Sequence, residues 1–172
     1  VIHFLLKQKK ASIAALVGTF VTAVTLILSL SLLGSDNSTT LFNWLQVGDF
    51  KIDIGLKLDQ LSTGMMIVVS GIGLLVHVFS LGYMKDDEAK ARYFGNLSLF
   101  MFSMTGIVLA SNFIMMFIFW ELVGLSSYLL IGHWYQKDSA ADAAKKAFLS
   151  NRVGDFGFLI GILMIWGISG SV

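Results

Sequence analysis

Residues 113–132 read FIMMFIFWELVGLSSYLLIG, and the only charged side chain in this stretch is that of Glu121. A helix rises about 1.5 Å per residue, so roughly 20 apolar residues cross a hydrocarbon core that is about 30 Å thick. Strands of a membrane barrel alternate in polarity and are about half as long. The stretch therefore predicts a transmembrane helix with one acidic group in its interior.

The composition of the whole chain agrees with a membrane location. Hydrophobic residues make up 56% of the 172 residues and charged residues only 13%, against about 25% charged residues in a typical soluble domain. The chain has no cysteine, which excludes disulfides, thiol catalysis and cysteine-ligated metal or iron–sulfur sites within it. The net charge of +1, with no basic patch interleaved with aromatic residues, gives no indication of nucleic-acid binding.

The apolar runs predict an all-α polytopic membrane protein with five transmembrane helices and one small surface β-hairpin. Residues 50–59 read FKIDIGLKLD and alternate between apolar and polar side chains, as in a half-buried strand. Gly48 and Asp49 precede this run and are typical of a hairpin turn. We expect one membrane domain over residues 1–172, with the hairpin at about 41–59. The expected spans are about 11–33, 61–84, 94–110, 113–134 and 147–171.

The basic residues indicate how the spans are oriented. Residues 7–10, 85–92 and 137–146 each contain three Lys or Arg residues, and alternating spans place all three segments on one side. The opposite side receives only Lys51 and Lys57. The positive-inside rule assigns the basic side to the cytoplasm or its equivalent, with the hairpin on the other face. Because the sequence starts without Met and stops inside an apolar run, we expect a piece of a longer chain.

Glu121 is the first candidate functional residue. Eight apolar residues precede it, which places it roughly 12 Å inside the helix. An ionised carboxylate at such a depth costs a few kcal/mol, so it needs a cationic partner, a bound proton, or each in turn. One interpretation is a proton relay that alternates between these two states. The other is a carboxyl group that only links helices together.

Three further groups are candidates for proton transfer. Arg152 and Asp155 have the i, i+3 spacing that places both on one helix face, and Lys145 shares that face if the helix extends back to it. These groups either form a proton input path and partner Glu121, or extend to water at the membrane surface. His77 lies well inside the second span. It is either a relay, because an imidazole titrates near neutral pH, or a packing residue.

Several motifs resemble one family of membrane proteins. Residues 119–132 (FWELVGLSSYLLIG) are similar to the central signature of subunit 5, or chain L, of the NADH–quinone oxidoreductase known as respiratory complex I. The similarity covers about residues 41–172. The other similar segments, in the order of the family, are LDQLS at 58–62, HVFSLGYM at 77–84, KAF at 146–148 and NRVGDFG at 151–157.

The resemblance implies an antiporter-like bundle of which this chain holds helices two to six. It implies a proton-translocating subunit without a redox centre, while NADH, FMN, iron–sulfur clusters and quinone belong to partner subunits. The family's functional glutamate falls on Glu121, and its Arg and Asp fall on Arg152 and Asp155. The resemblance also implies that Glu121 pairs alternately with a lysine of the seventh helix, beyond Val172. The implied surroundings are other complex I membrane subunits and lipid, in a bacterial inner membrane or an organelle inner membrane.

Two related assemblies remain as alternatives. Large subunits of multisubunit sodium/proton antiporters carry a similar Trp-Glu span, although the run NRVGDFG favours the complex I type. The photosynthetic version of the complex shares both motifs and takes electrons from ferredoxin. A third hypothesis is a structural membrane subunit that serves only assembly.

Overall fold

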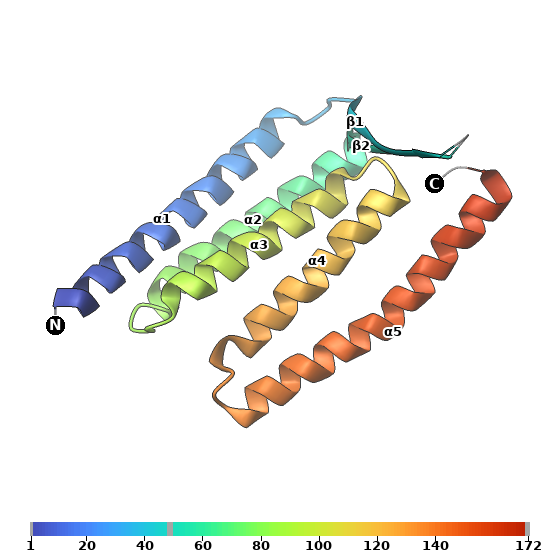
Figure 1. Ribbon diagram of the computed structural model, residues 1–172. Coiled ribbons are helices and arrows are strands. Elements are labelled where there is room, and N and C mark those ends of the chain that lie inside the picture. The colour runs from blue at the N-terminus through green and yellow to red at the C-terminus, as the bar shows by residue number, and fades with distance from the viewer. Residues whose placement is uncertain (1, 48–49, 171–172) are drawn as a thin grey trace.

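The computed structural model describes residues 2–47 and 50–170, which form five long helices and a two-stranded sheet (Figure 1). Helix α1 packs on α2 and α3, α2 packs on α3, α3 on α4, and α4 on α5. The elements in chain order are α1 (Ile2–Ser31), β1 (Asn37–Val47), β2 (Phe50–Leu58), α2 (Gln60–Tyr83), α3 (Lys90–Leu109), α4 (Phe113–Ile131), the 3-10 helix η1 (Gly132–Trp134) and α5 (Asp138–Ser169).

The expected fold class, a helical membrane protein with a small surface hairpin, is confirmed. Within the described residues, four helical segments are long and apolar enough to cross a membrane, namely Ala11–Ser31, Gln60–Tyr83, Phe113–Trp134 and Asp138–Ser169. Helix α3 corresponds to the third predicted span, at about 94–110. It is not among these four segments, since its first turn carries Lys90 and Arg92. It packs against α1, α2 and α4, so neighbouring helices cover much of its surface.

Two helices begin earlier than their apolar runs. Helix α1 starts at Ile2, so the basic residues 7–10 are helical although they precede the span Ala11–Ser31. Helix α5 starts at Asp138, so it extends back past Lys145, ahead of the expected span 147–171. The segment 138–146 contains four alanines, the strongest helix formers, and an Asp142–Lys145 ion pair of 3.5 Å at i, i+3 spacing. Its charges indicate where the helix meets water, not where the helix ends.

The predicted hairpin is present and is attached to the α3–α4 turn. Strands β1 and β2 pair antiparallel from Asn37–Leu58 to Val47–Phe50, while the predicted turn residues 48–49 lie outside the described residues. Strand β1 begins earlier than the expected residue 41 because its pairing with β2 continues to the end of that strand. The side-chain nitrogen of Asn112 donates a 2.6 Å hydrogen bond to the backbone carbonyl of Asp53. The hairpin is thus fixed against the end of the helix bundle.

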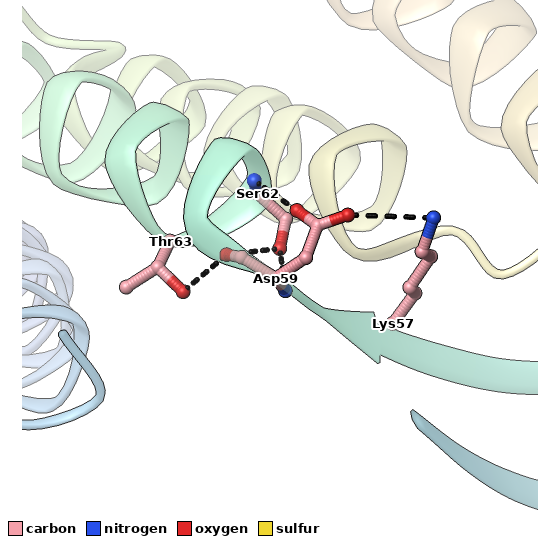
Figure 2. Close-up of polar contacts among 4 residues, drawn as sticks. All are labelled: Lys57, Asp59, Ser62 and Thr63. Atoms are coloured by element: carbon pink, nitrogen blue, oxygen red, sulfur yellow. Dashed lines mark hydrogen bonds and ion pairs between the residues drawn. The ribbon is translucent and has the colours of Figure 1, made fainter. Parts of the chain in front are cut away.

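The start of α2 is defined by a capping box (Figure 2). The Asp59 carboxylate accepts a 2.7 Å hydrogen bond from the Ser62 backbone N–H, and the Ser62 hydroxyl oxygen accepts one of 2.7 Å from the Asp59 N–H. Lys57 lies 3.3 Å from the other oxygen of this carboxylate. The Ser62 backbone N–H is the main cause that lowers the pKa of Asp59 below its ordinary 3.8. The carboxylate therefore caps α2 down to about that pH and loses this role as the pH falls through the lowered pKa.

The connections place the basic segments together. Figure 1 shows the N-terminal end of α1, the α2–α3 loop and the η1–α5 connection at one end of the bundle, and the hairpin and the α3–α4 turn at the other. This is the arrangement that alternating spans require. At the first end, a small core joins the first three helices through Ala15, Met84, Phe94 and Leu97.

We expect Asp59→Ala in the full-length parent protein to open the first turn of α2 about fivefold more often, a typical effect of losing an N-cap. The rate of trypsin cleavage after Lys57, whose side chain is exposed, reports this opening. The matched control is Asp59→Asn, which keeps an acceptor oxygen and should cleave at nearly the wild-type rate. Equal acceleration in both variants would show that the charge, and not the cap, stabilises this turn.

Candidate functional site

Glu121 and Arg152 form an ion pair between α4 and α5, through Oε2 of the carboxylate and Nη1 of the guanidinium. The two side chains are 27% and 35% exposed, respectively, so neither is fully solvated. Glu121 comes from the middle of α4 and Arg152 from the middle of α5. The structure therefore brings together the two groups of opposite charge that the sequence placed inside separate spans.

Asp155 is a second carboxylate on the same guanidinium. Its Oδ2 lies 3.3 Å from Arg152 Nε, as the i, i+3 spacing predicted, and its side chain is only 7% exposed. Its other oxygen, Oδ1, accepts a 2.8 Å hydrogen bond from the indole N–H of Trp120. Arg152 thus lies between two carboxylates from two helices, and Trp120 holds one of them in place.

The guanidinium occupies a space that a glycine leaves open. A Cβ atom at Gly124 would lie 3.2 Å from Arg152 Nη2 and 3.8 Å from Asn151 Nδ2. On the other side, the guanidinium carbon lies 4.6 Å from the centroid of the Phe148 ring, a distance at which a cation is attracted to an aromatic face. An alanine at residue 124 would therefore press on the end of the Arg152 side chain, which would have to shift by a few tenths of an ångström.

A cavity of about 540 Å³ borders this cluster. Its polar lining comes from α5 through Ser150, Asn151 and Asp155, and the rest is mostly apolar side chains of α3 and α4. A cavity of this size with several polar partners can hold water molecules. Within residues 2–47 and 50–170, no group of three or more His, Cys, Asp or Glu side chains is arranged to hold a metal ion. The arrangement suits proton transfer through carboxylates and water.

The other two predicted site residues lie elsewhere. Lys145 lies on α5 but pairs with Asp142 and is well exposed, so it is not joined to Arg152. His77 is fully buried in α2, and its Nδ1 donates a 2.8 Å hydrogen bond to the Gly73 carbonyl. The His77 ring faces Gly18 of α1 and Phe94 of α3. The structure therefore groups Glu121, Arg152 and Asp155 and leaves His77 in a separate helix interface.

Sequence reasoning missed two features. One is the hydrogen bond from Trp120 to Asp155. An indole N–H in an apolar span needs a hydrogen-bond partner, so the sequence did indicate that Trp120 would have one. The other is a pair at the basic end, where His133 Nε2 lies 3.4 Å from Asp87 Oδ2. A histidine at the end of an apolar span was visible in the sequence, but its partner comes from a loop that precedes it by two helices.

Two family descriptions match two successive, separate parts of the chain. Residues 44–94 match "NADH-Ubiquinone oxidoreductase (complex I), chain 5 N-terminus". Residues 110–172 match "NADH:quinone oxidoreductase/Mrp antiporter, TM". The second match contains Glu121, Arg152 and Asp155, and the first contains His77.

Curated relatives carry corresponding names. The chain is 47% identical over 131 residues to NADH-quinone oxidoreductase subunit L of Mycobacterium tuberculosis, which covers 76% of this chain and 21% of that protein. It is 43% identical over 164 residues to the chloroplastic NAD(P)H-quinone oxidoreductase subunit 5 of Angiopteris evecta, an alignment that covers 92% of this chain and 21% of that protein. For NAD(P)H-quinone oxidoreductase chain 5 of Synechocystis, identity is 45% over 138 residues, with coverages of 80% and 20%. The chain thus spans about a fifth of the length of these relatives.

Solved structures share the fold. The Mrp complex from Dietzia sp. DQ12-45-1b contains a chain that superposes with a TM-score of 0.79 at 23% identity, covering 99% of this chain and 20% of that one. The membrane-bound sulfane sulfur reductase, an archaeal respiratory membrane complex, gives a TM-score of 0.74 at 17% identity, with coverages of 97% and 36%. At these identities the likeness concerns the arrangement of helices alone.

We expect Arg152→Met in the full-length parent protein to lower the free energy of unfolding, because it leaves Glu121 without its cation. The loss should be smaller than the roughly 3–5 kcal/mol of a fully buried pair, since both side chains are partly exposed. The double variant Glu121→Gln/Arg152→Met should recover part of the loss. Thermal unfolding midpoints measure both effects, and an unchanged midpoint in Arg152→Met would mean that Glu121 is already neutral.

Proposed function

Because the chain belongs to the antiporter-like family that includes chain 5 of complex I, we propose that it is a proton-translocating segment of such a subunit. Glu121 is the group that binds and releases the proton. The observation that carries this proposal is the Glu121–Arg152 ion pair inside two membrane spans, with Asp155 as a second partner for the same cation. A carboxylate inside a membrane span with a movable counter-charge is what reversible protonation within a membrane requires.

The mechanism rests on competition for Arg152. While Arg152 pairs with Glu121, the carboxylate is stabilised in its ionised form. If Arg152 moves wholly to Asp155, 3.3 Å from its Nε, Glu121 loses its counter-charge and takes up a proton. The return of Arg152 favours the ionised form again and expels that proton. The hydrogen bond from Trp120 keeps Asp155 in place throughout.

Water in the adjoining cavity supplies the connection to the cluster. The cavity of about 540 Å³ reaches Asp155 and Gly124, beside Arg152. Water molecules that bridge polar groups can conduct protons where no side chain is close enough. Asn151 and Ser150 provide the hydrogen-bonding groups along its α5 wall.

The rest of the assembly follows from the names of the relatives. We infer that electron transfer from NADH to quinone, with FMN and iron–sulfur clusters, takes place in partner subunits and drives the movement of Arg152. A lysine beyond residue 172 is a further proposed partner of Glu121. The basic end faces the cytoplasm or its equivalent, in a bacterial inner membrane or an organelle inner membrane. His77 and Lys145 are weaker proposals for proton transfer, since neither contacts the Glu121 cluster.

A stand-alone cation/proton antiporter is the second candidate function. It is favoured by the family description that names Mrp antiporters over residues 110–172 and by the fold shared with the Mrp complex. The same carboxylate and cation serve either assembly, because neither needs a redox centre in this chain. Sodium- or pH-dependent exchange without an electron donor would identify the antiporter, and the ferredoxin-linked complex would be identified by its electron donor.

We expect Glu121→Gln to reduce NADH-driven proton pumping per assembled complex to a small fraction of the wild-type value, because glutamine cannot carry a proton. The measurement uses membrane vesicles that contain the full-length parent protein, normalised to assembled complex. Glu121→Asp is the matched control, since it keeps a carboxylate and should retain part of the activity. Unchanged pumping in Glu121→Gln would reduce Glu121 to a packing carboxyl, and a loss of assembled complex alone would favour the structural-subunit hypothesis.

We also expect Gly124→Ala to impair pumping, because its Cβ would lie 3.2 Å from Arg152 Nη2 and displace the guanidinium. The matched control is Gly161→Ala on α5, where an added Cβ meets no atom within 4 Å among the described residues. Both substitutions raise helix propensity by similar amounts, so a difference in pumping per assembled complex reports the displacement. Equal activity of the two variants would contradict the requirement for close approach.

A further inference from the structure

A second titratable cluster lies at the basic end of the bundle. Asp87 lies in the α2–α3 loop and His133 in η1, and Nε2 of the imidazole is 3.4 Å from Oδ2 of the carboxylate. The same Oδ2 accepts a 2.8 Å hydrogen bond from the Trp134 indole N–H, and Oδ1 accepts one of 2.6 Å from the Ala89 backbone. Arg92 donates a 2.7 Å hydrogen bond to the His133 carbonyl. The loop and the end of α4 are therefore held together by several independent contacts.

The two groups are arranged one behind the other. The Asp87 side chain is 16% exposed and borders a surface hollow of about 480 Å³, whereas the His133 side chain is only 3% exposed. The imidazole is enclosed by the rings of Tyr93 and Trp134, whose centroids both lie 5.3 Å from its own. Both ring nitrogens are buried, and neither has a hydrogen-bond partner among the described residues. A proton that arrives from water therefore meets the carboxylate first and the imidazole second.

The surroundings of Asp87 keep its carboxylate ionised, so that its negative charge attracts protons from water. Burial raises the pKa of Asp87, but the hydrogen bonds from Trp134 and Ala89 and the nearby His133 together lower it below its ordinary 3.8. The other charged or titratable side chains around the pair are Glu88 and Arg92 in the hollow, Tyr93 against the imidazole, Lys137 over the Trp134 ring, and Asp86 beside Asp87 in sequence.

We propose that Asp87 and His133 form a proton-collecting site at the basic membrane surface, a proposal that rests on the proton-translocating function proposed above. A proton from water binds the Asp87 carboxylate and moves to Nε2 of the neutral imidazole, which becomes a cation for the duration of the transfer. The imidazolium then holds this proton beside the ionised Asp87 carboxylate. The proton returns through Nε2 and Asp87 to the water of the hollow, so one proton is released for each one bound.

A purely structural role explains the carboxylate but not the imidazole. The Trp134 indole and the Ala89 backbone already hold Asp87, and Arg92 already holds the η1 backbone through a carbonyl. None of these contacts uses the His133 ring. An imidazole whose Nε2 lies beside a surface carboxylate, with no hydrogen bond that occupies it, is suited to take a proton from that carboxylate and hold it.

The test compares His133→Gln with Lys51→Gln in the full-length parent within the assembled complex. Glutamine at residue 133 keeps a polar group near Asp87 but cannot titrate, while Lys51→Gln removes a titratable group from β2, at the opposite end of the bundle. We expect proton uptake from the basic side to slow by roughly tenfold in His133→Gln at mildly alkaline pH, the lower end of the range for charge-assisted capture. The deficit should shrink at acidic pH, where protons are abundant, and on addition of imidazole buffer. Lys51→Gln should keep the wild-type pH profile.

The outcomes separate this proposal from the function on which it rests. An unchanged pH profile in His133→Gln, together with lost pumping in Glu121→Gln, overturns the collecting site and leaves the proposed function in place. A deficit in His133→Gln that is independent of pH and not restored by imidazole buffer also overturns it, because it indicates a structural role. Absence of proton pumping by the assembled wild-type complex would overturn the proposed function itself.

Discussion

The cost of an ionised carboxylate within a lipid bilayer is the constraint on which the rest of this structure depends. Glu121 lies deep in α4 and needs a cation within contact distance. Arg152 supplies it from α5, so the pairing fixes which faces of α4 and α5 meet. Gly124 leaves room for the guanidinium, because a Cβ there would press against Arg152 Nη2. One electrostatic requirement thus accounts for the contact between α4 and α5 and for the advantage of a small residue beside it.

The ends of the helices are fixed by polar contacts outside the apolar spans. The capping box at Asp59 sets where the chain leaves the hairpin and enters α2. The Asn112 side-chain oxygen accepts a hydrogen bond from the Met115 backbone N–H at the start of α4, and its nitrogen donates one to the Asp53 carbonyl of the hairpin. On the basic side, Asp87 of the α2–α3 loop and Arg92 of α3 both bond to η1. Within the spans, by contrast, the contacts between helices are mostly apolar packing, and Glu121, Arg152 and Asp155 form the charged cluster between α4 and α5.

Patterns that are local in sequence were predictable, and contacts between distant segments were not. Apolar length identified the spans, alternation identified β2, and the i, i+3 spacing joined Arg152 to Asp155. The apolar run gave only the span within α5, and the helix extends further back to Asp138, where alanines and an Asp142–Lys145 pair favour helix. The hydrogen bond from Trp120 to Asp155 joins residues 35 positions apart. Only the packing of α4 on α5 creates such a pair, and no spacing rule reveals it.

The two titratable clusters lie on α4 and at its end, and their separation constrains the proton path that we propose between them. Glu121 and His133 are twelve residues apart in sequence, or about 18 Å along a helix axis, so direct transfer between them is impossible. A hollow of about 260 Å³ between α3, α4 and α5 lies along this interval and is lined by Asn96, Tyr128 and Arg92. Its amide and phenol can order water. A path from the basic surface to Glu121 therefore depends on water held between the helices and not on a continuous chain of side chains.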